Sequence, residues 1–396
     1  MLKGSKIINC AIVRKMEAPL VVDGSFLEGG GQILRLAISY SAILGIPIRV
    51  ISIRANRPKP GLAQQHLNGI KLVADMCGGD LKGAYLGSTE VEFYPKTVKG
   101  GFFKMHLTTA GSIALMLQSA LPVSLFAKND VQLSLGGGTD CSFAPLIDYT
   151  IDVLGFYLKK FDIDLNLVLK QRGLFPKGGG RVEAHIKKLE KPLKPLVIEE
   201  AGKCCQINTK VIYTGPESDK GSHYVVKSIE KTFESLKSSG IEIKTDRIKE
   251  TRMIPNSADT ILLDVTYITD KGVKCSTSRI FDNPRNNKRK FDRNSHPETF
   301  HSQSSKIEQI SSEAANEIIN LIKNSVCCDS HMQDQLIVFM ALAEGTSRIV
   351  VDQITDHTRT TQYVTHLLTK AEVNFIPIDN DSRYIIECKG IGMAPK

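Results

Sequence analysis

The feature that most constrains the fold is an alternation of two hydrophobic periods along the chain. Apolar residues follow helical spacing over 31–45 and again over 62–79, and a β-rich run at 46–54 separates the two. Further strands are expected around 84–95. Helix-period segments that alternate with short strands are typical of layered α/β proteins. The first part of the chain is therefore predicted to form a βαβαββ unit.

The same order of elements recurs twice more. A second unit is expected from the helix at 107–127 to the strands at 165–173 and 180–189, with a strand at 130–138 and a helix at 144–163 between them. A third is expected from 327 to 396, where strand 348–354 precedes a helix over 359–371. We therefore predict an α/β fold of three βαβαββ units, with the first two in residues 1–198.

Residues 199–326 interrupt this rhythm. The strands expected at 206–215 and 260–269, with a helix near 222–238, indicate a smaller inserted α/β domain. Within it, the segment at about 281–306 is polar, basic and nearly free of aliphatic residues, so we expect a flexible loop. Its "NKRK" core could be a nuclear import signal or an RNA contact, although a solvated loop is the commoner meaning.

Charge and hydropathy narrow the class of partner. The chain carries a formal net charge of +9 and a pI near 9.0, which favours a polyanionic partner without demanding one. No apolar run approaches the length of a membrane span, and the opening "MLKGSKIINC" does not resemble a secretory signal. We therefore expect a protein of the cytosol or nucleus with no membrane partner.

The first candidate site is the triple glycine Gly29–Gly31, which opens a helix. Glycines let the backbone approach a ligand closely, and the N-terminus of a helix suits an anion. Glu28 precedes the glycines, where a carboxylate could bind a divalent metal, and Arg35 lies one turn into the helix. An ordinary glycine turn, with a carboxylate that favours the helix dipole, explains the motif equally well.

A second candidate is the cationic segment 54–59. Arg54, Arg57 and Lys59 lie on a stretch stiffened by two prolines, and Gln65 and His66 follow on the next helix. Guanidinium groups on a rigid loop are well suited to phosphate oxygens. Exposed arginines that only contact solvent are the alternative.

Two further candidates lie in the last unit. His357 stands between an expected strand and the helix after it, where ligands of α/β proteins collect and where a neutral imidazole can act as a nucleophile. A polar turn residue or helix cap is the plainer reading. His331, Asp334 and Gln335 precede a strongly apolar helix, where they could bind a base or ribose or simply favour the helix start.

Taken together, these motifs resemble a known family. The segments "EGGGQILRLA", "IRANRPKPGLAQQH", "AGSIALMLQSALP", "RGLFPKGGG", "QDQLIVFMALA" and "DHTRTT" occur in the order found in the RNA 3'-terminal phosphate cyclases, most like the eukaryotic branch. The resemblance implies three βαβαββ units similar to those of enolpyruvyl transferases, with a smaller inserted domain. It also implies conversion of an RNA 3'-phosphate to a 2',3'-cyclic phosphate, with ATP and Mg²⁺ or Mn²⁺, through a histidine–AMP adduct and an RNA-ppA intermediate.

The resemblance also assigns residues. His357 corresponds to the nucleophile that is adenylylated, and Glu28 to the metal-binding carboxylate. The positions that contact phosphate or the reacting groups are Arg35, Arg54, Arg57, Gln65 and His66. The nucleotide-binding positions are Gln118, Pro145, His331, Asp334 and Gln335. The chain departs from the family at His331, where a tyrosine usually stacks on adenine, and in the basic segment, which replaces a short glycine-containing loop.

Three other functions remain open from the sequence. A non-catalytic scaffold of the same fold, as in ribosome biogenesis, would lack the histidine and the glycine motif that are present here. An enolpyruvyl transferase would need neither the histidine nor an ATP site. A plain RNA-binding module would explain the charge but not Glu28 together with His357. Covalent attachment of AMP separates the cyclase from all three. The family likeness and the basic segment predict a nuclear location.

Overall fold

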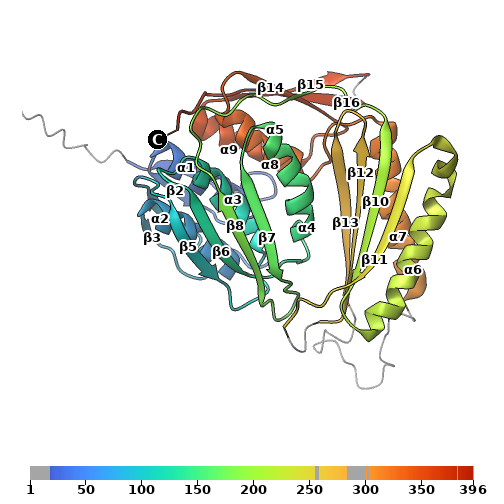
Figure 1. Ribbon diagram of the computed structural model, residues 1–396. Coiled ribbons are helices and arrows are strands. Elements are labelled where there is room, and N and C mark those ends of the chain that lie inside the picture. Colours follow the sequence, from blue (N-terminus) through green and yellow to red (C-terminus); the bar gives the residue numbers. More distant parts are fainter. Residues whose placement is uncertain (1–17, 255–257, 283–299, 301–302, 381, 396) are drawn as a thin grey trace, which may run out of the picture.

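The computed structural model describes residues 18–254, 258–282, 300, 303–380 and 382–395 (Figure 1). Their strands form four mixed sheets of four strands each, all accompanied by helices. This confirms the prediction of an α/β protein. None of the helices in these ranges is long and apolar enough to span a bilayer.

The first sheet follows the expected order of elements. Its elements are β1 (Leu20–Asp23), α1 (Gln32–Leu44), β2 (Ile48–Ile51), α2 (Gln64–Cys77), β3 (Asp80–Lys82) and β4 (Val91–Tyr94), with strand order β1-β2-β4-β3. Both helices end at a glycine in the left-handed conformation, Gly45 (φ 74°) and Gly78 (φ 60°), which allows the chain to reverse. Several strands were expected around 84–95, but only β4 lies in that range, and left-handed turns at Gly83 and Gly87 separate it from β3.

The second sheet repeats this order. Its elements are β5 (Gly101–His106), α3 (Ile113–Leu125), β6 (Val131–Gly137), α4 (Ile147–Tyr149), a π-helical turn (Thr150–Leu154), α5 (Gly155–Lys160), β7 (Leu165–Gln171) and β8 (Gly180–Ile186). The strand order is β5-β6-β8-β7. The single helix expected over 144–163 is thus interrupted by a wider turn. The sequence analysis did not identify β5.

The third sheet is assembled from two distant parts of the chain. Its elements are β9 (Val197–Ile198), α8 (Gln333–Leu342), β14 (Thr346–Val351), α9 (Asp356–Thr369), β15 (Glu372–Ile378) and β16 (Arg383–Lys389), in strand order β15-β16-β14-β9. Strand β9 pairs in parallel with β14, opposite Arg348 and Ile349. The sheet therefore begins before the inserted segment, whereas the sequence placed its start at 327.

The fourth sheet belongs to the insertion. Its elements are β10 (Cys204–Tyr213), α6 (Pro216–Phe233), a 3-10 turn (Glu234–Ser239), β11 (Glu242–Lys249), β12 (Thr260–Thr269), β13 (Lys274–Asp282) and α7 (Ser304–Lys323). Figure 1 shows α6 and α7 together on the side of this sheet that faces away from the other three. Most of the expected loop 281–306 lies outside the described residues. Its ends differ from the expectation, since they belong to β13 and α7 and since Phe300 is buried.

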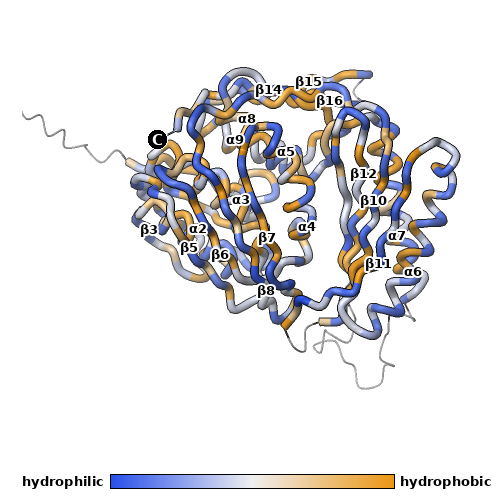
Figure 2. Tube along the Cα trace, in the orientation of Figure 1, coloured by the Kyte–Doolittle hydropathy of each residue, from blue (hydrophilic) through white to orange (hydrophobic). Residues whose placement is uncertain are grey.

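The core lies between the sheets and their helices. Strand β8 alternates buried and outward positions, and Figure 2 shows the corresponding alternation of hydrophobic and hydrophilic residues along the strands. Helix α3 is buried over almost its whole length, as expected for a helix that is apolar on all sides.

A buried ionic cluster joins the second sheet to the insertion. The Arg172 guanidinium contacts carboxylate oxygens of Asp140 at 2.7 Å, Asp148 at 2.8 Å and Glu250 at 3.1 Å. Because Arg172 is 1% exposed, the loss of Arg172 or of its carboxylate partners would leave uncompensated charge in the interior. The cluster therefore helps to fix the insertion against the body of the protein.

Candidate active site

His357 is the second residue of α9, not part of the turn before it. Thr355 caps this helix, since its side-chain oxygen accepts the backbone N–H of Thr358 at 3.1 Å. The cap moves the start of α9 three residues ahead of the predicted one, and places the His357 imidazole in the first turn. That side chain is 52% exposed and is therefore accessible to a ligand.

The histidine is held by Gln32, the first residue of α1. Gln32 Oε1 lies 2.8 Å from His357 Nδ1, while its Nε2 donates to Asp334 Oδ2 at 2.7 Å and to Thr361 Oγ1 at 3.0 Å. The amide oxygen can only accept, so Nδ1 carries the proton and Nε2 keeps its lone pair. Sequence reasoning did not single out Gln32. Its only signal there is a polar residue directly after the three glycines.

The Nε2 side of the ring faces Glu28. Glu28 Oε2 lies 3.5 Å from His357 Nε2 and 3.1 Å from Arg57 Nη2. Thus the carboxylate lies between the candidate nucleophile and a cation from the proline-stiffened segment. Residues more than 300 positions apart in the sequence meet at this point.

The triple glycine is required by the packing at the start of α1. A Cβ on Gly31 would lie 2.2 Å from His66 Nε2 and 3.1 Å from Arg35 Nη1, although the backbone there has ordinary helical angles (φ −81°). A glycine at this position therefore allows His66 and Arg35 to approach the helix N-terminus. The first-turn N–H groups of α1 have no side-chain cap, which leaves them suited to an anion.

His66 is a buried, neutral histidine. Burial lowers its pKa to about 3, with further repulsion from Arg35 and Arg54. Within the described part of the chain, its Nδ1 has no hydrogen-bond partner. A buried polar atom without a partner requires an explanation, and a ligand or water at the glycine turn would supply one.

Arg35 and Asp334 both line a small pocket. Arg35 Nε donates to Gln118 Oε1 at 3.1 Å. Burial lowers the Arg35 pKa to about 10, opposed by the charge of Asp334, and it raises the pKa of Asp334, opposed by His357, His331 and Arg35. The pocket is lined by Gln32, Arg35, Leu36, Gln118, Leu121, Pro122, Leu154, Asp334, Gln335, Val338, Phe339 and Thr361.

This pocket brings together three of the predicted nucleotide-binding residues, Gln118, Asp334 and Gln335. Its lining combines apolar side chains with a few polar ones, a composition typical of small-ligand sites. Its volume of about 30 Å³ is roughly the share of one water molecule. A base could enter only if side chains at its edge moved.

Arg54 and Gln65 are two further candidates for contact with phosphate. Arg54 has φ 55° and donates from Nη1 to the carbonyl of Gly61 at 2.8 Å. Gln65 Oε1 accepts the backbone N–H of Ser112 at 3.3 Å. The positive φ of Arg54 is unfavourable for a residue with a side chain, and such backbone strain is frequent near functional sites.

His331 and Pro145 lie further from the candidate active site in terms of direct contacts. His331 is exposed at the start of α8, and its charge acts on Asp334 one turn further on. Pro145 is half-buried in the loop between β6 and α4. Among the described residues, no hydrogen bond or ion pair joins Pro145 to the other candidates.

The exposed carboxylate that the site offers to a divalent metal is that of Glu28. No three His, Cys, Asp or Glu side chains cluster in the described ranges as a metal cage would require. Glu28 is one exposed carboxylate and already pairs with Arg57. That fits Mg²⁺, which commonly binds one or two carboxylates together with substrate phosphates and water.

The fold and the site define a class of protein. It is an α/β protein with an accessible imidazole at a helix N-terminus, beside a carboxylate, arginines and a second helix N-terminus suited to anions. These groups are the ones that phosphoryl chemistry uses.

Comparisons with known proteins make the class specific. A family model described as RNA 3'-terminal phosphate cyclase matches residues 26–375. Proteins named RNA 3'-terminal phosphate cyclase from Pyrobaculum aerophilum and Drosophila melanogaster are each 33% identical, over 374 and 390 residues. These alignments cover 94% and 96% of this chain, and 98% and 99% of the relatives. One from Pyrococcus furiosus is 34% identical over 87% of this chain and 92% of its own.

The chain therefore belongs to the RNA 3'-terminal phosphate cyclase family. This confirms the resemblance seen in the sequence motifs. The prediction of an ATP-dependent enzyme of the ligase type is confirmed at the level of the family.

Proposed function

We propose that this enzyme converts an RNA 3'-terminal phosphate to a 2',3'-cyclic phosphate in three nucleotidyl and phosphoryl transfers, with ATP as co-substrate and a covalent His357–AMP adduct. The observation that carries the proposal is the fixed, accessible imidazole, whose Nδ1 is held by Gln32 and whose Nε2 faces Glu28. Family membership supports the overall reaction.

In the first step, His357 Nε2 attacks the α-phosphorus of ATP. The N–P bond forms, the bond to the β-phosphate oxygen breaks and pyrophosphate leaves. The Nδ1 proton stays on the ring in its hydrogen bond to Gln32, so the adduct is a cationic phosphoramidate that transfers AMP readily. Gln118, Asp334 and Gln335 bind the nucleotide. His331 and Pro145 complete its site.

In the second step, an oxygen of the RNA 3'-phosphate attacks the phosphorus of the adduct and releases the imidazole, forming RNA-ppA. In the third, the neighbouring 2'-hydroxyl gives its proton to solvent and attacks the terminal RNA phosphorus, and the bond to AMP breaks so that AMP leaves. That attack is intramolecular and needs only orientation. Arg35, Arg54, Arg57, Gln65 and His66 orient the phosphate, with His66 acting as a neutral hydrogen-bond partner.

A divalent metal, Mg²⁺ or Mn²⁺, would be bound by Glu28 together with substrate oxygens. When bound, it would neutralise charge on the phosphates. Arg57 would then exchange its contact with Glu28 for a contact with phosphate, because both cations compete for the same carboxylate.

The same proposal covers the organisation and location of the protein. We assign residues 1–198 and 327–396 to a catalytic body with the arrangement found in enolpyruvyl transferases, and residues 199–326 to the inserted domain. A nuclear location, with some protein in the cytosol, agrees with the family likeness and with the basic segment outside the described residues.

The test is the reaction itself. An RNA with a 3'-phosphate is incubated with ATP and Mg²⁺, and the end group is examined by phosphatase treatment and chromatography of the terminal nucleotide. A phosphatase-resistant 2',3'-cyclic end, with one AMP released per end converted, is the expected result. ATP binding without a cyclic product would indicate the non-catalytic scaffold instead.

A further inference from the structure

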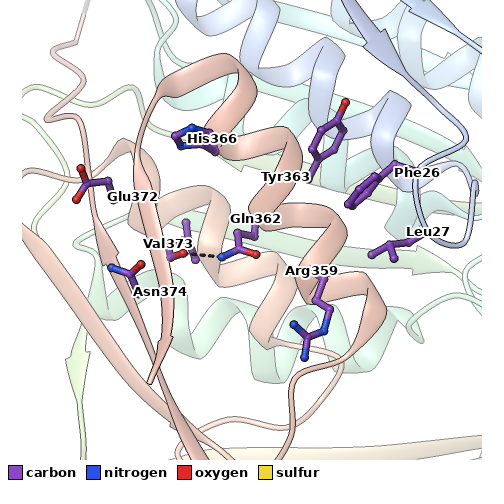
Figure 3. A pocket seen from close by; sticks show the side chains of 9 residues that line it. All are labelled: Phe26, Leu27, Arg359, Gln362, Tyr363, His366, Glu372, Val373 and Asn374. Carbon is purple, nitrogen blue, oxygen red and sulfur yellow. Dashed lines mark hydrogen bonds between the residues drawn. The ribbon is translucent and has the colours of Figure 1, made fainter. Parts of the chain in front are cut away.

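A second and larger cavity lies beside the active site, along the outward face of α9. Its volume is about 570 Å³, within the range of small-ligand sites. Figure 3 shows its floor on α9, one wall formed by Phe26 and Leu27, and the other formed by the start of β15. Leu27 directly precedes Glu28, which contacts His357. The loop 26–28 therefore runs from the groove to the candidate active site.

The floor of the groove is a helical stripe that begins at Arg359, on the side of α9 opposite His357. Arg359, Gln362, Tyr363 and His366 follow the spacing that places side chains on one helix face. From His357 to His366 the helix rises by about 14 Å, at about 1.5 Å per residue. This stripe can hydrogen-bond, stack and carry positive charge, which are the interactions that bind single-stranded nucleic acid.

An aromatic stack stands at one side of the groove. The rings of Phe26 and Tyr363 are 4.2 Å apart at an interplanar angle of 21°, and Phe26 is 37% exposed. A nearly parallel pair of partly exposed rings is a surface on which a third flat ring can stack.

The cation in the groove is Arg359, and within the described ranges it forms no ion pair. The Arg359 guanidinium lies over the Phe375 ring at 5.8 Å. Within the described ranges it has no ion-pair partner and no hydrogen-bond acceptor. An exposed arginine that is held over a ring but is otherwise unsatisfied is available to a phosphate.

A peptide strand added to β15 is a weaker fit for the same groove. Although β15 is an edge strand, Gln362 Nε2 donates to the backbone carbonyl of Val373 at 2.6 Å, as Figure 3 shows. An added strand would need that carbonyl, so the helix occupies a hydrogen-bonding position that such a partner requires.

We propose that this groove binds the RNA nucleotides immediately before the 3'-phosphate. In this arrangement a base stacks on the Phe26–Tyr363 pair, and Arg359 contacts the backbone phosphate beside it. The inference rests on the proposed function, because it takes the 3'-phosphate to lie between His357 and the arginines. It extends that function by giving the RNA strand a direction, from His357 around the first turn of α9, beside the loop 26–28, and along the groove toward His366.

The test measures RNA binding without ATP. The probe is a 5'-fluorescein decauridylate that ends in a 3'-phosphate, and its Kd is measured by anisotropy over a range of salt concentrations. Tyr363→Ala is expected to weaken binding about tenfold or more, the effect typical of losing one stacked base. Arg359→Ala is expected to weaken it and to reduce the slope of log Kd against log salt by about 0.7, one phosphate contact on a single strand.

Matched variants separate the groove from general effects. Tyr363→Phe keeps the stack and should bind like the wild type. Arg181→Ala removes an equal charge from an exposed position on β8, in another sheet, and should leave the affinity and salt slope nearly unchanged. Adenylylation with ATP alone, measured on each variant, shows whether the active site is intact.

The outcomes are distinct. Weaker RNA binding by Arg359→Ala and Tyr363→Ala, with wild-type adenylylation, supports the groove. Unchanged affinity in both variants overturns it and would leave the groove to another class of partner, such as a peptide. If Tyr363→Ala also loses adenylylation because the loop before Glu28 has moved, Arg359→Ala alone decides. A wild type that binds RNA through these residues but never adenylylates would overturn the proposed function and not the groove.

Discussion

Gln32 Oε1 lies 2.8 Å from Nδ1 of His357, although the two residues are 325 positions apart in the chain. The same amide donates to Asp334 and Thr361, so its orientation is fixed by three partners. The contact selects one tautomer of the imidazole and directs the lone pair of Nε2 toward Glu28. Gln32 is thus a positioning residue for the candidate nucleophile.

We predict that Gln32→Leu slows formation of the His357–AMP adduct by about 10- to 100-fold, the usual effect of losing a partner that orients a reactive histidine. The rate of labelling by α-labelled ATP gives the measurement. Gln362→Leu on α9 is the control, because Gln362 hydrogen-bonds the carbonyl of Val373 and, within the described residues, does not contact His357, so the variant should label at the wild-type rate. Equal rates in the two variants would contradict the positioning role.

Gly31→Ala tests the close approach at the glycine turn. The new Cβ would lie 2.2 Å from His66 Nε2, so we expect His66 to be displaced and RNA cyclisation to fall at least tenfold. Gly69→Ala, inside α2, meets nothing closer than 3.9 Å and should raise stability by about 0.5–1 kcal/mol. Product yield and thermal melting of both variants are compared. A fully active Gly31→Ala would contradict the packing argument.

Arg57→Ala should impair transfer more than folding. Arg57 is exposed and its ion pair with Glu28 is of the kind that contributes at most about 1 kcal/mol to stability. We expect the melting temperature to stay close to the wild-type value while conversion of RNA 3'-phosphate ends falls at least tenfold. Normal turnover would mean that Arg57 is only a surface charge.

A pH dependence of stability is expected from the inserted domain. Burial raises the pKa of Asp264 to about 6, above its usual 3.8, so between these pH values the folded protein binds more protons than the unfolded chain. Stability from this group is therefore present below about pH 4 and is lost as the pH rises to about 6, by up to about 3 kcal/mol. Denaturant unfolding should show this fall in the wild type and not in Asp264→Asn. Parallel curves would contradict it.

Much of the fold could be predicted from the sequence, and some of the elements that could not were missed for physical reasons. Helices α1 and α2 were recognised because their apolar faces repeat at helical spacing, and α8 because it is strongly apolar along its length. Strand β9 has only two residues, too few for any period, and its partner β14 lies beyond the insertion. Helix α7 was not identified from the sequence, although its buried residues Ile307, Ser311, Ala314, Ile318 and Leu321 follow helical spacing.

The candidate site, too, could be predicted from the sequence only in part. Residue types and motif order indicated Glu28, Arg57 and His357, and the structure brings these three together. The contact of Gln32 with His357 and the close approach of His66 to Gly31 depend on how α1, α2 and α9 pack. No local pattern encodes such packing, so neither could be read from the sequence.

The most direct measurement is the site of covalent AMP. Wild type, His357→Ala and, as a control on the same helix, His366→Ala are incubated with α-labelled ATP and Mg²⁺, resolved under denaturing conditions and mapped by mass spectrometry. We predict an acid-labile label on His357 in the wild type and in His366→Ala, and none on a folded His357→Ala. A label that persists in His357→Ala, or its absence from a wild type that binds ATP, would contradict the histidine–AMP mechanism.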